Sequence, residues 1–156
     1  KTITALIKIS LQVQTDTYLG LTKNHCMMNS RRFYKELGNL FYAIAAADKH
    51  ISTKEKKVLD DEVQFAWKHY DKTTDRFGSD RAFLIEFEFA TMGDIDEPAE
   101  SAYQSFELFF KDYEKEIDHP TRTRIFNSAR HIAEGVRKIN QDELGYLVRL
   151  KKLLQV

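Results

Sequence analysis

Cysteine, proline and glycine are scarce in this chain: its 156 residues include one cysteine, two prolines and six glycines. With Cys26 as the single thiol, an intramolecular disulfide and a zinc site built from several thiolates are excluded, and a cytoplasmic location is expected. The shortage of turn-forming residues disfavours a β-sandwich and favours long helices. No apolar run approaches the roughly 20 residues of a membrane span, so we expect no segment that crosses a bilayer.

An excess of charge of one sign is also missing, because 24 basic residues balance 24 acidic ones. The balance gives no reason to expect nucleic acid as a partner, and the basic clusters lack the interleaved aromatic residues that stack on bases. Residues 80–118 hold 12 acidic against 3 basic residues, and residues 121–156 hold 8 basic against 3 acidic. The contrast predicts two segments that pack as neighbours, with a bipolar surface that steers partners as the alternative.

From residue 31 onward apolar residues recur with helical spacing, which predicts an all-α fold. We expect a compact bundle of about six helices, over about residues 30–47, 53–70, 81–92, 96–117, 120–134 and from 141 onward. Gly93 is expected to end the third helix. The residues expected to face the core are Phe33, Leu37, Leu40, Phe41, Ile44, Val58, Leu59, Phe65, Ala66, Phe83, Leu84, Phe87, Ala102, Phe106, Phe109, Phe110, Tyr113, Ile117, Ile125, Ala129, Ile132, Leu144, Leu147, Leu150 or Val148, and Leu154.

Residues 1–30 have a different pattern. Ile7, Ile9, Leu11 and Val13 alternate with polar residues, which is typical of a strand, but the pattern offers only a short second strand and a lone hairpin is marginal in water. Met27 and Met28 make a natural start just before the first helix. We therefore expect residues 1–30 to be a weakly ordered or appended N-terminal extension, and residues 31–156 to form the helical domain.

A shift of 88 residues superposes two helix–helix corners. Ile51-Ser52 matches Ile139-Asn140, and Glu55 matches Glu143. Each copy reads as a helix, a short corner with an isoleucine, a capping residue and a second helix, which is an αα-hairpin. The repeat predicts a pseudo-two-fold relation between two hairpins, with each isoleucine packed into the core.

The first corner supports two interpretations. In one, Ser52 and Glu55 form a capping box, in which each side chain bonds the backbone N–H of the other residue. In the other, Asp48, Ser52 and Glu55 are metal ligands, because their spacing matches the second half of an EF-hand loop. The first half of that loop is missing and Lys49 replaces its turn glycine, so a full calcium loop is excluded. What remains is a partial site for calcium or a similar divalent cation, completed by Asp94, Asp96 or Glu97.

The corner Ala46-Ala47-Asp48-Lys49-His50-Ile51-Ser52-Thr53-Lys54-Glu55 resembles the tellurite-resistance TerB family, whose pattern is Ala-Ala-Asp-Gly-x-Ile-Ser-x-x-Glu. The second corner also fits that family's duplicated helical layout, with Val136 in place of the acidic residue. The resemblance implies an all-α, non-enzymatic domain linked to tellurite resistance or stress response, in systems often near membranes. A peripheral membrane association therefore stays open. The departures at Lys49 and Val136 weaken the metal-binding role suggested for that family.

Catalytic signatures are absent: the sequence has no glycine-rich phosphate loop, no His-Glu-x-x-His motif and no nucleophile elbow. The acidic group Asp94, Asp96, Glu97 and Glu100 is explained by the positive end of the helix that follows it. We therefore expect a TerB-like partner-binding or sensing module with a divalent-cation site at Asp48, Ser52 and Glu55. The alternative is a purely structural protein–protein interaction domain with no metal site.

Overall fold

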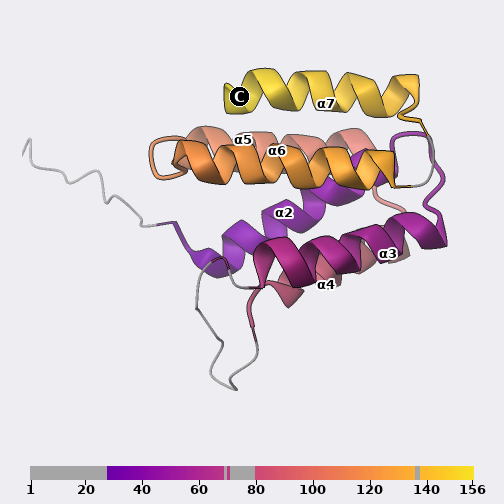
Figure 1. Ribbon diagram of the computed structural model, residues 1–156, viewed down its shortest axis with the longest axis horizontal. Helices are drawn as coiled ribbons and strands as arrows, with labels where there is room; N and C mark the ends of the chain where they lie inside the picture. The colour runs from indigo at the N-terminus through magenta and orange to yellow at the C-terminus, as the bar shows by residue number, and fades with distance from the viewer. Residues whose placement is uncertain (1–27, 69, 71–79, 136–137) are drawn as a thin grey trace, which may run out of the picture.

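The computed structural model describes residues 28–68, 70, 80–135 and 138–156, and the regular structure in these ranges is helical throughout (Figure 1). Six α-helices and one π-helical segment make up the described domain, which confirms the predicted all-α bundle. They are α2 (Ser30–Ala45), α3 (Thr53–Glu62), η1 (Val63–Trp67), α4 (Phe83–Asp94), α5 (Ala99–Tyr113), α6 (His119–Glu134) and α7 (Gln141–Leu154). The alternating segment of the predicted extension lies outside the described residues.

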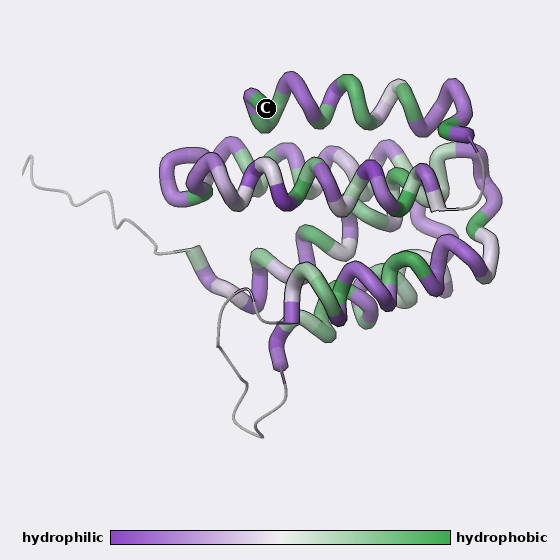
Figure 2. The backbone as a smooth tube through the Cα atoms, in the orientation of Figure 1, coloured by the Kyte–Doolittle hydropathy of each residue, from purple (hydrophilic) through white to green (hydrophobic). Residues whose placement is uncertain are grey.

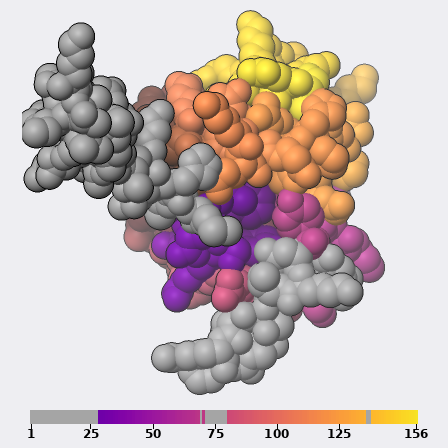
Figure 3. Space-filling model, turned by 90° about the vertical axis from the view of Figure 1, so that its left-hand side faces the viewer, coloured from indigo at the N-terminus to yellow at the C-terminus, as the bar shows by residue number. Residues whose placement is uncertain are grey.

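Helix α2 is the centre of the bundle. It packs against α4, α5, α6 and α7. In Figure 1 it crosses between α3 and α4 on one side and the layer of α5, α6 and α7 on the other. In the turned view of Figure 3, the indigo of α2 lies beneath the orange of α6 and beside the magenta of α3. The first corner, residues 46–52, and residues 138–140, which precede α7, lie at the same end of the described domain.

Helix α2 forms where the sequence predicts a helix, and ends two residues earlier than expected. The Asn29 side chain caps its start by accepting a hydrogen bond from the Arg31 backbone N–H. All five residues expected to face the core from this helix are buried, each 1% exposed or less. Gly38 permits the closest approach of α4, because a Cβ atom there would lie 2.7 Å from the Cβ atom of Glu88. Any larger residue would push the two helices apart.

The second predicted helix changes its winding part of the way along. After ten α-helical residues it continues as the π-helix η1, and its inward stripe becomes Leu59, Val63 and Trp67, at a spacing of four. A π segment has more residues per turn than an α-helix, which keeps this stripe on one face. The same change turns Phe65 outward, where it is 85% exposed. The prediction that Phe65 faces the core is therefore wrong.

Helix α4 also departs from the predicted face. Ile85 and Phe89 are buried, whereas Phe83 and Phe87, which were expected inside, are 40% and 66% exposed. The helix is apolar on every side, so its sequence pattern cannot select the face that packs. Gly93 does not end α4, which runs one residue further to Asp94.

Helix α7 packs with one face and leaves apolar residues on the other. Hydrophobic and hydrophilic residues alternate along it in Figure 2. Leu147, Leu150 and Leu154 are buried as predicted, but Leu144 is 51% exposed, because it lies on the outward face. The predicted attraction between the acidic and basic segments is confirmed by Arg149 of α7, which pairs with Glu100 of α5 at 2.6 Å.

Candidate functional site

Both helix–helix corners are closed by a capping box. At the first, the Glu55 backbone N–H donates to Ser52 Oγ at 3.2 Å, and the Ser52 N–H donates to Glu55 Oε2 at 2.6 Å. At the second, Asn140 and Glu143 make the same pair of bonds at 2.8 Å each. This confirms the capping prediction at both corners. Ile51 and Ile139 are partly buried against the core, again as predicted. The pseudo-two-fold relation itself stays a prediction.

Asp48 joins the two corners to each other. Its Oδ1 accepts a hydrogen bond from the backbone N–H of His50 at 3.0 Å, and its Oδ2 accepts one from the Asn140 side-chain amide at 3.3 Å. Because Asn140 also caps α7, the carboxylate of one corner meets the cap of the other. The internal repeat in the sequence gives no sign of this contact, because aligning the two corners as copies does not show that they lie side by side.

The three predicted metal ligands are thus engaged within the protein. Ser52 and Glu55 bond each other's backbone, and Asp48 bonds Asn140. Among the residues that the structure describes, no three His, Cys, Asp or Glu side chains are grouped so that they could hold a metal ion. A cleft beside the corner is lined by Asp94, Asp96 and Glu97 but by none of the three predicted ligands. Metal binding at Asp48, Ser52 and Glu55 stays a prediction.

Lys49 has a backbone conformation that suits glycine. Its φ angle is 64°, in the left-handed region that a Cβ atom disfavours. This is the position at which the TerB pattern has glycine, and here a lysine adopts the backbone conformation that suits glycine. Asp96, which follows α4, has a φ angle of 52°. Both residues line the same cleft.

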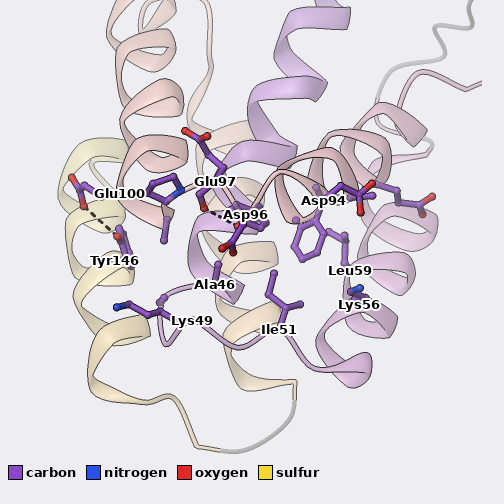
Figure 4. A pocket seen from close by; sticks show the side chains of 18 of the residues that line it. Ala46, Lys49, Ile51, Lys56, Leu59, Asp94, Asp96, Glu97, Glu100 and Tyr146 are labelled. Carbon is purple, nitrogen blue, oxygen red and sulfur yellow. Dashed lines mark hydrogen bonds between the residues drawn. The ribbon is translucent and has the colours of Figure 1, made fainter.

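The first corner helps to form this cleft, which has a volume of about 1050 Å³. In Figure 4, Glu100 and Tyr146 stand on one side, Lys56, Leu59 and Asp94 on the other, and Ala46 and Asp96 between them. Its walls therefore come from the first corner, α3, the α4–α5 junction and α7. We refer to this hollow as the corner cleft.

The floor of the corner cleft is apolar and fixed. Tyr42, Leu59 and Phe89 line it and are each 3% exposed. The Tyr42 hydroxyl donates to the backbone carbonyl of Glu97 at 2.8 Å, which ties the α4–α5 junction to α2. Ala90 lies at the rim and is exposed. The cleft is held open by packed residues of several helices.

The rim of the corner cleft is acidic. Six carboxylates and two lysines line it, a formal net charge of −4. Two of the acids have partners nearby: Glu100 binds Arg149, and Glu97 accepts a hydrogen bond from Ser101. The other four take part in none of the salt bridges between described residues. These four residues are Asp60, Glu86, Asp94 and Asp96.

Two pKa shifts reflect this negative environment. Burial raises the pKa of Glu86, and the charge of Asp60 raises it further. Burial likewise raises the pKa of Tyr42, with added contributions from Asp96 and Glu97. In both groups burial is the larger cause, because removal from water disfavours the charged form, and the neighbouring carboxylates add to it by repulsion.

A second polar cluster lies outside the corner cleft, between α3, η1 and α6. Ser128, 1% exposed, accepts a hydrogen bond from Trp67 Nε1 at 3.0 Å and donates to Glu62 Oε2 at 2.6 Å. Glu62 Oε1 also contacts His131 Nδ1 at 2.8 Å. Here the carboxylate stands between the serine and the histidine, whereas nucleophile activation needs the histidine between the other two. The cluster therefore closes a buried seam and does not form a catalytic triad.

Comparison with known proteins finds no matching family model, no matching curated protein and no matching solved structure. The likeness to the TerB pattern consequently rests on the corner residues alone. Among the described helices, none is both long enough and apolar enough to cross a membrane.

Proposed function

We propose that this chain is a non-enzymatic helical module that binds a protein partner in the corner cleft. The observation that carries the proposal is the combination of an apolar floor, built from packed residues, with an open rim at a junction of several helices. Protein-binding grooves combine an apolar centre that can be desolvated with a polar edge. The described cleft lining contains no serine, threonine, cysteine or histidine, so a hydroxyl or thiol nucleophile paired with a histidine base is absent from it.

The resemblance of Ala46 to Glu55 to the TerB pattern supports a role for the proposed module in tellurite resistance or stress response. The chain has a single cysteine, which suits the cytoplasm. Nucleic acid is disfavoured as a partner, because an acidic cleft repels phosphate groups. The competing proposal is a purely structural interaction domain, in which the corners serve only to turn the chain and the cleft stays empty.

A site-specific photo-cross-linker separates these proposals. Introduced at Ala90, on the cleft rim, it should trap a discrete protein partner in cells of the source organism. The matched control is Asn127, which is exposed on α6 and does not line the cleft. Cross-linking to the same partner from both positions, or from neither, would overturn binding at the cleft.

A further inference from the structure

The corner cleft combines three properties that together define its occupant. The first is charge: four rim carboxylates are outside the salt bridges of the described chain, and only Lys49 and Lys56 line the cleft as cations. A carboxylate rim of this kind attracts ammonium and guanidinium groups and repels phosphates and carboxylates. The occupant is therefore cationic.

The second property is the apolar floor, which continues outside the cleft. Phe87, Ala90 and Asp94 lie at positions i, i+3 and i+7 of α4 and are all exposed, so they share one face of the helix. Ala90 lines the cleft, and Phe87, 66% exposed, extends this apolar strip beyond it, while Asp94 at the end of the same face is a rim carboxylate. A bare cation or a polyamine would leave this strip in water. An occupant that covers it needs apolar side chains as well as positive charges.

The third property is size. The volume of about 1050 Å³ lies at the upper limit of small-molecule pockets, which span roughly 300–1,000 Å³. With the strip on α4, the surface suits a peptide segment better than a compact ligand. Amphipathic helices are recognised in such grooves through apolar side chains at spacings of three and four, with charges at the edges.

We propose that the corner cleft binds a basic amphipathic segment of a protein partner, with its apolar side chains on the floor and its lysines or arginines against Asp60, Glu86, Asp94 and Asp96. This inference rests on the proposed function and specifies the partner's chemistry. It assigns Asp60 a role that helix-end electrostatics does not supply, because Asp60 lies in the interior of α3, whereas Glu86 is in the first turn of α4.

The test uses a labelled helical peptide of leucine and lysine, about 14 residues long, with leucines at helical spacing. Its matched control has glutamate at every lysine. Fluorescence anisotropy should show binding of the lysine peptide only, weakened by salt because the contacts are exposed. Amide chemical-shift changes should gather at Ile51, Leu59 and Gly93. Shifts scattered over the whole surface would overturn a defined site.

Two sets of variants locate the charge effect. The first set combines Glu86→Gln, Asp94→Asn and Asp96→Asn. It should raise the Kd of the lysine peptide about tenfold, since each exposed ion pair contributes less than a factor of ten. Asparagine also tolerates the left-handed backbone at position 96. The control, Asp61→Asn, Asp112→Asn and Asp142→Asn, removes the same charge at exposed positions outside the cleft. Equal weakening by both sets would mean non-specific attraction and would refute the proposal.

Introducing a charge of either sign at position 90 gives a second, independent measurement. Ala90→Arg should weaken the lysine peptide and Ala90→Glu should tighten it, with circular dichroism to verify the fold of both. If Ala90 traps a partner in cells but the peptide does not bind the cleft, the basic segment is wrong and partner binding stands. If the peptide binds but no partner is trapped, the proposed function is what fails. Self-association that the cleft substitutions abolish would replace the separate partner with a second copy of this chain.

Discussion

The Asp48 carboxylate accepts a hydrogen bond from the Asn140 side-chain amide over 3.3 Å, although 92 residues separate the two in sequence. Both residues are half-buried. The bond ties together two corners that each already hold a capping box. Asp48, which has no acidic counterpart in the second corner, therefore has a structural role that requires no ligand.

A double-mutant cycle measures this link. Asp48→Ala removes the acceptor, and Asn140→Ser removes the amide while keeping a side-chain oxygen that can cap α7. We expect a coupling free energy of roughly 0.5–1 kcal/mol in urea unfolding, the low end for contacting residues, because the bond is partly exposed. Additive effects of the two substitutions would show that the contact contributes nothing. Lys54→Ala, at an exposed position of α3, is the control and should not couple to Asn140→Ser.

Cation binding at the first corner is tested by calorimetry with Ca²⁺, Mg²⁺ and Zn²⁺. Because Ser52 and Glu55 are occupied by the capping box and Asp48 by Asn140, we expect no binding tighter than about millimolar, the range of the weakest calcium modules. A tighter signal in the wild type that disappears in Asp48→Ala would instead establish the site that the sequence predicts.

Lys49 and Lys56 should respond in opposite ways to replacement by glycine. Lys49 has a left-handed backbone, which costs a residue with a Cβ atom about 1–2 kcal/mol. Glycine avoids this strain, but it loses roughly 0.5–1 kcal/mol of stability because its unfolded chain has more conformational entropy. Lys49→Gly should therefore stabilise the fold by up to about 1 kcal/mol. Lys56→Gly, inside α3, should cost about 1 kcal/mol. A loss of stability at both positions would contradict strain at Lys49.

Burial of the Trp67–Ser128–Glu62 seam makes Ser128 a sensitive position. Ser128→Ala leaves the Trp67 N–H and a Glu62 oxygen without their partner in a site that is 1% exposed. We expect a loss of about 1–3 kcal/mol in the free energy of unfolding. Ser101→Ala, at an exposed position of α5, should change it by less than about 0.5 kcal/mol. Similar values for the two would rule out the seam as a stabilising contact.

The sequence predicts local features well and the corner cleft not at all. All five core residues that helical spacing predicts on α2 are buried, although Tyr34, Tyr42, Ala43 and Ala45 are buried as well. The order Ser52 to Glu55 is enough to predict a capping box. The exposed Phe65 and Phe87 were missed for physical reasons, since a π segment changes the period and α4 is apolar on every side.

The cleft depends on tertiary packing. It brings Tyr42, Lys49, Glu86, Asp96 and Tyr146 together from α2, the first corner, α4, the α4–α5 junction and α7. Charge counts give only the coarse signal that residues 80–118 are acidic. They do not show which carboxylates are paired. That distinction decides which acids are available to a ligand, and it required the positions of the neighbouring helices.

Glu100 and Arg149 should give the fold a pH-dependent contribution. The two-point contact with Arg149, at 2.6 and 2.9 Å, lowers the pKa of Glu100 from its ordinary 4.5 to about 2. A lowered carboxylate pKa stabilises the fold above the unfolded value and loses that effect as the pH falls toward the folded value. Both side chains are more than 40% exposed, so the contribution at neutral pH should not exceed about 1 kcal/mol.

Glu100→Gln should destabilise the protein at pH 6 and have little effect near pH 2. Asp112→Asn, exposed and outside the described salt bridges, is the control. An equal cost of Glu100→Gln at both pH values would show that packing, and not charge, explains the effect.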